Sequence, residues 1–418
     1  MKSIAAFLLA LFLMFSITPI IALGSSSTKG TLPIVQGEGA YLIDVLSGQT
    51  LFMKNPDQPL APASTTKIMT GLLAIERGNL NDIVTASPTM LNNKLVYGTR
   101  IYLEPGEKLS LQDLLHATLL NSANDAAVTI AEHVGGDLPH FVEMMNQRAQ
   151  EIGALQTHFK NPSGLTEQGH VTTAHDLALI ARVAYQNPIF AEYVRTKSKT
   201  ISRSKENVPS LLVNQNKLLW MDAAVDGIKL GYTAAAQNCL VASASKDGRQ
   251  LIGVILKSPG KEIYTDMENM FEYGFTEFET IVYKPKGAAM ASITVDSQSV
   301  DLILDRPIYI TQKLGEQQKT LDLRVSPLNL GTLSSVEEGQ VVAQVAVLDG
   351  ITHLDTFPLK TSRAVQPKIP YQTVGSFQTS WFFGAMAMVG IVVFINHKRN
   401  ASRYLKRQAR LAKRRESS

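Results

Sequence analysis

The chain has 418 residues, of which 45% are hydrophobic and 18% are charged, and its formal net charge at pH 7 is +4. This composition excludes an intrinsically disordered protein and leaves room for two or three folded domains. Residues 397–418 carry nine Lys/Arg and one Glu, so the body of the chain is mildly acidic and is not expected to bind nucleic acid. The single cysteine excludes an internal disulfide, and the eight histidines show no metal-ligand spacing.

The N-terminus has the pattern of a secretory signal peptide at residues 1–24. Lys2 is followed by a long apolar run and then by small residues around Ala22 and Gly24. An uncleaved membrane anchor is the alternative interpretation of the same residues. A signal peptide predicts that the body lies outside the cytoplasm. Cys239 stands in an apolar, strand-like run, where a buried core thiol is expected.

Residues 25–283 mix helical and strand patterns and predict one α/β domain. In chain order, the predicted elements are a hairpin at 41–55 that turns at Ser47-Gly48, a helix at 64–77 that stops at Gly78, a helical region at 110–136 that begins with a Ser110–Asp113 capping pattern, and apolar strands at 239–245 and 251–258.

The pattern changes after residue 283. Residues 284–365 form short, alternating, β-branched runs, which predict a small all-β domain. A Pro-containing linker is expected at 366–376, and the uncharged run at 377–396 predicts a transmembrane helix. The basic tail at 397–418 predicts a cytoplasmic end that touches anionic membrane lipid, and thus a single-pass topology. An amphipathic surface helix is the alternative at 377–396.

The first chemical motif is Ser64-Thr65-Thr66-Lys67. Ser-x-x-Lys is a weak signal, because it occurs five times, at Ser26, Ser64, Ser202, Ser243 and Ser258. Only Ser64 follows a proline and opens a helical apolar run. Residues three apart share a helix face, so Lys67 can reach the Ser64 hydroxyl. A lysine removes that proton only when it is neutral, which predicts burial and a second cation nearby.

Two further motifs follow in the chain. Ser122-Ala123-Asn124 interrupts a helical apolar pattern, and it reads either as a polar break between two helices or as a site that passes protons and positions a lysine. Lys229-Leu230-Gly231 stands between an Asp-Gly pair and an apolar strand. A glycine at such a strand edge lets the backbone approach a bound peptide closely, and the lysine supplies charge.

The order Ser-x-x-Lys, Ser-x-Asn, Lys-x-Gly resembles the penicillin-recognising serine peptidases and β-lactamases. Over roughly residues 31–280, the chain is most similar to the low-molecular-weight penicillin-binding proteins that are D-alanyl-D-alanine carboxypeptidases. This resemblance rests on the segments "PASTTKIMT", "NSANDAA", "THFKNPSGLTEQGHVTTAHDLALIA", "VDGIKLGYT" and "CLVASAS". It implies an α/β catalytic domain of the penicillin-binding protein and β-lactamase type, an antiparallel sheet with helices. The β domain and the C-terminal transmembrane helix fit the resemblance more loosely.

The resemblance also implies roles for individual residues. Ser64 would be the acylated nucleophile, Lys67 its base and Ser122 a proton relay. Substrate would be bound by Asn124, Lys229, Gly231, Tyr232 and Thr233, with the backbone N–H groups of Ser64 and Tyr232 as the oxyanion hole. The implied substrate is a peptidoglycan stem peptide ending in D-Ala-D-Ala, with β-lactams as inhibitors and with no cofactor or metal.

Alternative functions stay open at this point. A β-lactamase of the same fold is one, and a catalytically weak penicillin-binding protein that organises the cell wall is another. Transpeptidase and D,D-endopeptidase activities are related possibilities.

One residue departs from the family pattern. Leu230 stands where the family usually has a threonine or serine, whose hydroxyl would bind the terminal carboxylate of the substrate. We predict that a hydroxyl at position 230, as in Leu230→Thr, would raise the activity of this enzyme. The opposing possibility is that Thr233 already makes the contact while Leu230 packs on apolar neighbours. The family also often has an arginine after the next strand, where this chain offers Lys257 and Lys261.

Overall fold

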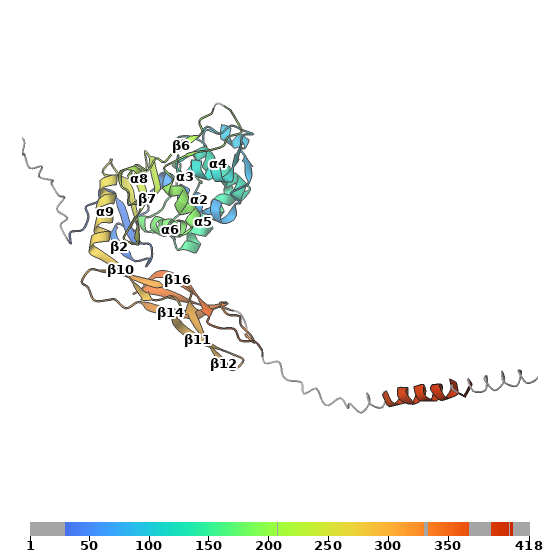
Figure 1. The fold of residues 1–418 in the computed structure, drawn as a ribbon. Helices are drawn as coiled ribbons and strands as arrows, with labels where there is room; N and C mark the ends of the chain where they lie inside the picture. Colours follow the sequence, from blue (N-terminus) through green and yellow to red (C-terminus); the bar gives the residue numbers. More distant parts are fainter. Residues whose placement is uncertain (1–29, 207, 330–332, 368–385, 401, 404–418) are drawn as a thin grey trace, which may run out of the picture.

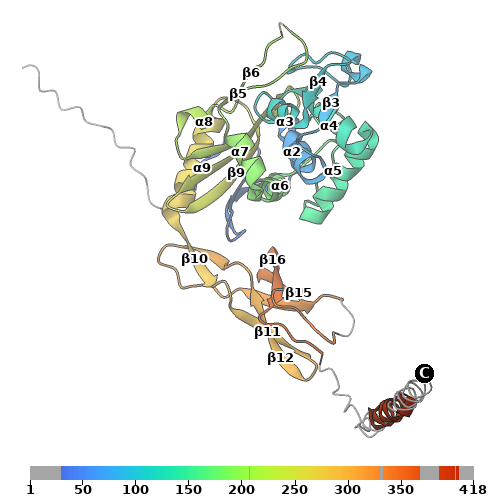
Figure 2. The same cartoon turned by 45° about the vertical axis from the view of Figure 1, so that its right-hand side comes forward.

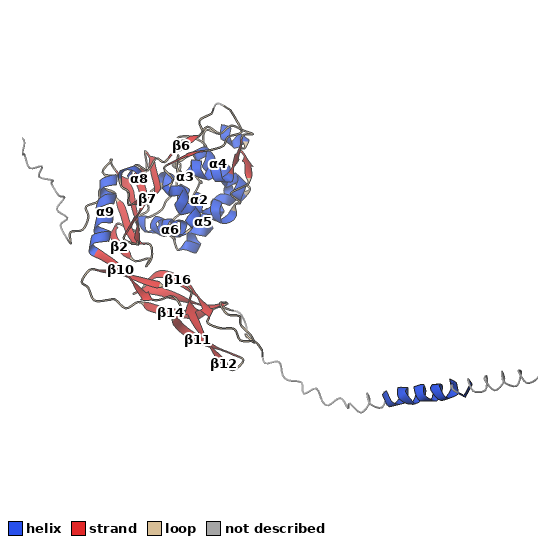
Figure 3. Cartoon of the chain, in the orientation of Figure 1, coloured by secondary structure: helices blue, strands red, loops and turns tan. Residues whose placement is uncertain are grey.

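The structure is a computed structural model, and it describes residues 30–206, 208–329, 333–367, 386–400 and 402–403. A larger unit of helices and strands is followed by a smaller unit built from strands (Figure 1, Figure 3). The predicted signal peptide lies outside the described residues, and so do most of the predicted linker and most of the predicted basic tail.

The larger unit is built around an antiparallel sheet with the strand order β2–β1–β9–β8–β7. Its strands are β1 (Gly39–Asp44), β2 (Thr50–Lys54), β7 (Val225–Thr233), β8 (Gln237–Lys246) and β9 (Arg249–Ser258). β8 is apolar on both faces because both are covered: Cys239 and Val241 join one apolar cluster, and Leu240 and Ala242 join the other. The predicted hairpin, the two predicted strands and the buried thiol are confirmed.

Helices cover both faces of this sheet. On one face, α9 (Ile263–Glu277) packs Met267 and Phe271 against the strands. Leu218 of α8 (Leu218–Met221) joins the same apolar cluster. The other face carries α6 (Ala174–Gln186), which packs on β1 and β9 (Figure 2). The other elements of this unit are η1 (Ala63–Thr66), α2 (Lys67–Arg77), β3 (Ile83–Thr85), η2 (Pro88–Leu91), β4 (Lys108–Ser110), α3 (Leu111–Leu119), α4 (Asn124–Gly135), α5 (Leu138–Ile152), α7 (Pro188–Arg195), β5 (Ser198–Thr200) and β6 (Leu211–Val213).

The helix boundaries follow from local chemistry. The Ser110 hydroxyl accepts a hydrogen bond from the Asp113 backbone N–H at 3.0 Å, as the capping pattern predicts for the start of α3. α2 ends at Gly78, where an added Cβ would lie 2.5 Å from the Leu111 side chain. The helical region predicted at 110–136 is two helices, α3 and α4, with the Ser122-x-Asn124 motif at the break.

The smaller unit consists of two antiparallel sheets. β10 (Phe278–Lys284) pairs with β13 (Ile308–Lys313). The second sheet has the order β11–β12–β16–β15–β14, with β11 (Ala289–Val295), β12 (Gln298–Leu304), β14 (Asp322–Pro327), β15 (Val341–Asp349) and β16 (Thr352–Thr361). Val300, Val345 and Phe357 lie in its apolar core. No helix occurs among its described residues, 278–329 and 333–367, which agrees with an all-β domain.

Polar contacts join the two units. Arg182 on α6 is buried, and its guanidinium donates to the Leu354 carbonyl at 3.1 Å and to the Asp355 carboxylate at 3.2 Å. From the β1–β2 turn, the Gln49 side chain donates to Asp349 at 3.0 Å and accepts from the Thr311 backbone N–H at 2.5 Å. Hydrogen bonds from both units therefore hold the β domain against the end of the five-stranded sheet at which the β1–β2 turn lies.

The predicted transmembrane helix is not supported by the structure. Residues 386–400 are helical, while residues 377–385 of the predicted span lie outside the described residues. In the part of the chain that the structure describes, no helix combines the length and apolar character needed to cross a membrane.

Candidate active site

Ser64 lies in η1, where this short helix touches both α2 and the edge strand β7. Its side chain is partly exposed, whereas Ala63 and Thr65 on either side are buried. Ala63 has φ +48°, a left-handed conformation that residues other than glycine rarely adopt. The surrounding contacts hold this turn: a Cβ on Gly164 would lie 1.8 Å from the Ala63 carbonyl oxygen, so only glycine fits against it.

The Lys67 amine is the centre of the site. Its Nζ lies 3.1 Å from the Ser64 Oγ, 2.6 Å from the Asn124 Oδ1 and 2.6 Å from the Ser163 carbonyl oxygen. The side chain is fully buried. Burial and, to a smaller extent, the positive charge of Lys229 hold the pKa of Lys67 well below its ordinary value. The lowered pKa favours the neutral amine, which is the form that can accept a proton from the serine.

Asn124 begins α4, and its amide is held at both ends. Its Oδ1 accepts from Lys67, while its Nδ2 donates to the Tyr97 carbonyl at 2.5 Å. Ser122, two residues earlier, is buried and has φ +61°. Its hydroxyl has no hydrogen-bond partner among the residues that the structure describes. The structure thus brings Ser64, Lys67 and Asn124 into one hydrogen-bonded cluster, and Ser122 lies outside this cluster.

Strand β7 brings the third motif to Ser64. A Cβ on Gly231 would lie 2.7 Å from the Ser64 backbone nitrogen, so the strand passes directly against the turn that carries Ser64. Lys229 is buried, its Nζ donates to the Leu230 carbonyl at 2.8 Å, and burial lowers its pKa to about 7. β7 is an edge strand, so one side of its backbone is unpaired within the sheet.

The other predicted residues of β7 have different surroundings. Tyr232 is 66% exposed. The Thr233 Oγ1 accepts from the Ala236 backbone N–H at 3.0 Å, which leaves its hydroxyl proton able to donate to a ligand. Leu230 pairs with Leu240 and packs on the apolar cluster under α9. The expectation that Leu230 packs on apolar neighbours is the one that the structure supports.

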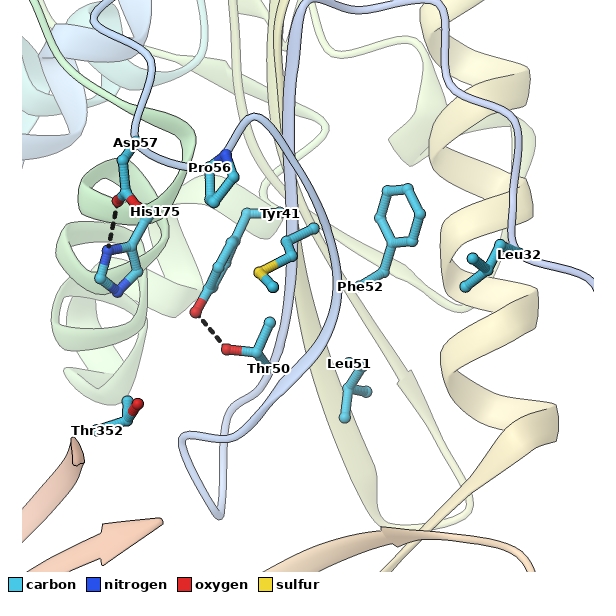
Figure 4. A pocket seen from close by; sticks show the side chains of 10 residues that line it. Leu32, Tyr41, Thr50, Leu51, Phe52, Pro56, Asp57, His175 and Thr352 are labelled. Carbon is cyan, nitrogen blue, oxygen red and sulfur yellow. Dashed lines mark hydrogen bonds and ion pairs between the residues drawn. The ribbon is translucent and has the colours of Figure 1, made fainter. Parts of the chain in front are cut away.

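A cavity of about 520 Å³ lies elsewhere, beside β2 (Figure 4). It is lined by Leu32, Tyr41, Thr50, Leu51, Phe52, Met53, Pro56, Asp57, His175 and Thr352. None of the predicted site residues lines it, and it contains no serine–lysine pair, so we assign the candidate site to the Ser64 cluster. The described residues include no group of three or more His, Cys, Asp or Glu side chains that could hold a metal ion.

Comparison with known proteins decides the family. The family model for D-alanyl-D-alanine carboxypeptidase matches residues 27–260, which include every predicted site residue. The chain belongs to the D-alanyl-D-alanine carboxypeptidase family. It is 33% identical over 332 residues to the D-alanyl-D-alanine carboxypeptidase DacF of Bacillus subtilis, covering 75% of this chain and 84% of that protein.

Two further relatives match different lengths of this carboxypeptidase. It is similar to the crystal structure of penicillin binding protein 5 from Haemophilus influenzae, with a TM-score of 0.63, 29% identity and coverage of 80% of this chain and 99% of that one. The D-alanyl-D-alanine carboxypeptidase DacB2 of Mycobacterium tuberculosis is 34% identical over 254 residues, which are 59% of this chain and 85% of that protein. The α/β domain followed by a β domain is therefore the fold of this carboxypeptidase.

The structure adds site groups that the motifs did not predict. The Ser163 carbonyl, which accepts from Lys67, lies in a turn that Asn161 organises: its Oδ1 accepts from the backbone N–H groups of Gly164 at 2.8 Å and Leu165 at 3.1 Å. The sequence signal was the Asn-Pro-Ser-Gly run, which is typical of a turn. A backbone carbonyl, however, leaves no mark of its own in the residue types.

The two lysines that were expected to replace the arginine of the family have other surroundings. The Lys257 Nζ forms an ion pair with Glu38 at 2.8 Å. Lys261 is exposed, just before α9. Lys257 is therefore already paired with a carboxylate of this chain, whereas Thr233 lies on β7, the strand that contacts the turn of Ser64.

Proposed function

We propose that this protein is a serine-type D-Ala-D-Ala carboxypeptidase that removes the terminal D-alanine from peptidoglycan stem pentapeptides through an acyl-Ser64 intermediate. The observation that carries the proposal is the Ser64 Oγ at 3.1 Å from the buried Lys67 amine, whose pKa is lowered by that burial. Family membership supports the same reaction.

The acylation step follows from the geometry. The lone pair of neutral Lys67 takes the Ser64 hydroxyl proton while Oγ bonds to the carbonyl carbon of the penultimate D-alanine. The oxyanion that forms is stabilised by the backbone N–H groups of Ser64 and Tyr232, which lie where β7 passes against η1. The C–N bond then breaks, and the proton on Lys67 passes to the departing amine of D-alanine. The family resemblance assigns the relay of this proton to Ser122, and this role requires its unbonded hydroxyl to join the cluster when substrate is bound.

Deacylation completes the cycle. Water attacks the ester carbon while Lys67 takes one of its protons. The bond from this carbon to Ser64 Oγ then breaks, Oγ takes the proton from Lys67, and the shortened peptide is released. A β-lactam undergoes the same attack, but its leaving nitrogen stays tethered to the acyl group after the ring opens. We expect penicillins to acylate Ser64 for this reason.

Carboxylate recognition is assigned to strand β7. The amine of Lys229 and the hydroxyl of Thr233 are the hydrogen-bond donors that this strand offers beside Ser64. Asn124 holds the substrate side of the Lys67 amine and is itself fixed by Tyr97. These roles agree with the order of the three motifs and with the family.

The direct test is release of D-alanine from diacetyl-L-lysyl-D-alanyl-D-alanine by the full chain. Ser64→Ala should lower the rate at least about 1,000-fold, because the nucleophile is lost, and should abolish labelling by a fluorescent penicillin. Ser202→Ala and Ser258→Ala remove serines of two other Ser-x-x-Lys matches and serve as controls with unchanged rates. Labelling of the Ser64→Ala protein at Ser202 or Ser243 would overturn the assignment.

We further propose that the enzyme works outside the cytoplasm and is held at the cell membrane by its C-terminal region. The support comes from the sequence: a signal-like N-terminus, an uncharged run at 374–396 and the basic residues that follow it. Fractionation of cells that express the full chain or residues 1–367 tests this. The full chain should sediment with membranes and the shortened one should be released; identical distributions would refute the attachment.

A further inference from the structure

The segment 159–170, here called the 159–170 loop, presses on the turn that carries the nucleophile. An antiparallel bridge closes its base, with His158 and Val171 exchanging backbone hydrogen bonds of 2.8 and 3.0 Å. Its Pro162 carbonyl accepts from the Thr70 hydroxyl at 2.6 Å. Its Ser163 carbonyl accepts from Lys67. The loop thus supplies one of the acceptors of the catalytic amine, although it lies about a hundred residues away in the chain.

His170 is the side chain that ties this loop to η1. Its Nδ1 lies 3.2 Å from the Lys160 backbone nitrogen, and its Nε2 lies 2.9 Å from the Thr66 Oγ1. A backbone N–H only donates, so Nδ1 must be the acceptor. The proton of the neutral ring is then on Nε2, which donates to Thr66. His170 therefore bridges the loop backbone and the residue that directly precedes Lys67.

The surroundings keep this imidazole neutral. The side chain is only 4% exposed, and the ring lies edge-on to Phe159 with the centroids 5.8 Å apart. Burial lowers the pKa of His170 to about 4, and the neighbouring positive charge of Lys160 acts in the same direction. At neutral pH the bridge therefore exists in one protonation state and one tautomer.

The His170 bridge affects catalysis through the geometry of the neutral Lys67 amine. Neutral Lys67 has two N–H bonds and one lone pair. When the two N–H groups point at the Asn124 Oδ1 and the Ser163 carbonyl, each at 2.6 Å, the lone pair is left for the Ser64 hydroxyl at 3.1 Å. A displaced Ser163 carbonyl would free one N–H, and the lone pair would no longer be aimed at the serine.

We propose that His170 is a positioning residue of this carboxypeptidase: by bridging Thr66 and the Lys160 backbone, it holds the Ser163 carbonyl against Lys67 and so aims the Lys67 lone pair at Ser64. The proposal rests on the function proposed above. It does not involve contact of His170 with the substrate, and it predicts an effect on the chemical steps in which Lys67 takes a proton, and none on substrate binding.

Stopped-flow acylation of the full chain by a fluorescent penicillin tests this, because it separates the binding constant from the acylation rate constant. His170→Leu and Thr66→Val each remove one end of the bridge. Each should lower the acylation rate constant at least about tenfold, with the binding constant and the labelled fraction unchanged. The double variant should be no slower than the slower single variant, since both changes break one bridge. His170→Gln, which keeps a donor toward Thr66, should recover part of the rate.

The matched control is His116→Leu. His116 is also a buried histidine, stacked on Tyr193 with its Nδ1 at the Gln112 carbonyl, and it belongs to α3 rather than to the loop. Its variant should acylate at the wild-type rate. A wild-type acylation rate in Thr66→Val would overturn the proposal, even if His170→Leu does not fold. An equal loss in His116→Leu would show a general packing effect instead. A wild-type protein that is not acylated would refute the proposed function itself.

Discussion

At the scale of single residues, the most unusual feature of the site is that it contains two buried lysines. Lys67 and Lys229 are both almost fully removed from water, and the charge of Lys229 contributes to the lowered pKa of Lys67. Burying an ammonium group costs free energy unless the group loses its proton. The environment that favours neutral Lys67 therefore also opposes protonation of these lysines in the folded protein.

The free-energy cost of burying a protonated lysine predicts that the stability of the folded protein depends on pH. The pKa of Lys229 is about 7 in the folded protein, against an ordinary value of 10.5. Between these values the unfolded chain binds a proton that the folded one does not, so the free energy of unfolding should rise with pH, by at most about 1.4 kcal/mol per pH unit for one group. As pH falls toward 7 this stability is lost.

Urea unfolding of the wild type and Lys229→Met at pH 7, 8 and 9 measures the effect. The variant should be more stable than the wild type at pH 7, and its free energy of unfolding should rise less steeply with pH. Parallel pH dependences in the two proteins would contradict the argument.

At the scale of elements, the alternating side chains of β7 contact η1 on one face of the sheet and the apolar cluster under α9 on the other. Lys229 and Gly231 belong to the side that meets η1, where Gly231 leaves room for the Ser64 backbone. Leu230, between them, packs on the cluster under α9. Successive side chains of a strand point to opposite faces, so residue 230 faces away from Lys229 and Gly231. Where the family usually has a hydroxyl at this position, this chain has an apolar side chain that packs on that cluster.

This difference from the family predicts that position 233 now matters more than position 230. Leu230→Thr should lower the free energy of unfolding by about 1–2 kcal/mol, because apolar contacts are lost. Thr233→Val should slow hydrolysis of the D-Ala-D-Ala peptide about tenfold, because a hydrogen bond to a carboxylate is worth about 1.5–3 kcal/mol. Thr233→Ser keeps the hydroxyl and is the control. Faster hydrolysis by Leu230→Thr, together with a fully active Thr233→Val enzyme, would contradict this assignment.

At the scale of the molecule, the β domain supports the catalytic domain without supplying site residues. All predicted site residues lie between Ser64 and Thr233, while the contacts of Arg182 and Gln49 reach into the β domain from the opposite end of the sheet. The pairing of β10 with β13 places Phe278–Lys284 with the β domain, so the structural junction follows α9.

A chain of residues 25–277 is therefore expected to keep the site and lose stability. Its acylation by a fluorescent penicillin should stay within about twofold of the full chain, because no site contact is removed. Its thermal midpoint should fall, since buried Arg182 loses the Leu354 carbonyl and the Asp355 carboxylate. Differential scanning fluorimetry gives the second value. Complete loss of labelling in a folded fragment would mean that the β domain completes the site.

The sequence by itself determined the local elements and singled out Ser64 as the predicted nucleophile. The Ser110 cap, the apolar strand around Cys239 and the proline-led helix start at Ser64 depend on residues that are neighbours in the chain, and motif order alone indicated the family. Only the tertiary structure decided which distant groups meet. Lys67 and the Ser163 carbonyl are 96 residues apart, and the bridge of His170 to Thr66 spans 104. A backbone carbonyl has no residue-specific signal, and its position depends on how the loop packs on the helix; the side of β7 that Leu230 faces likewise depends on which cluster covers it.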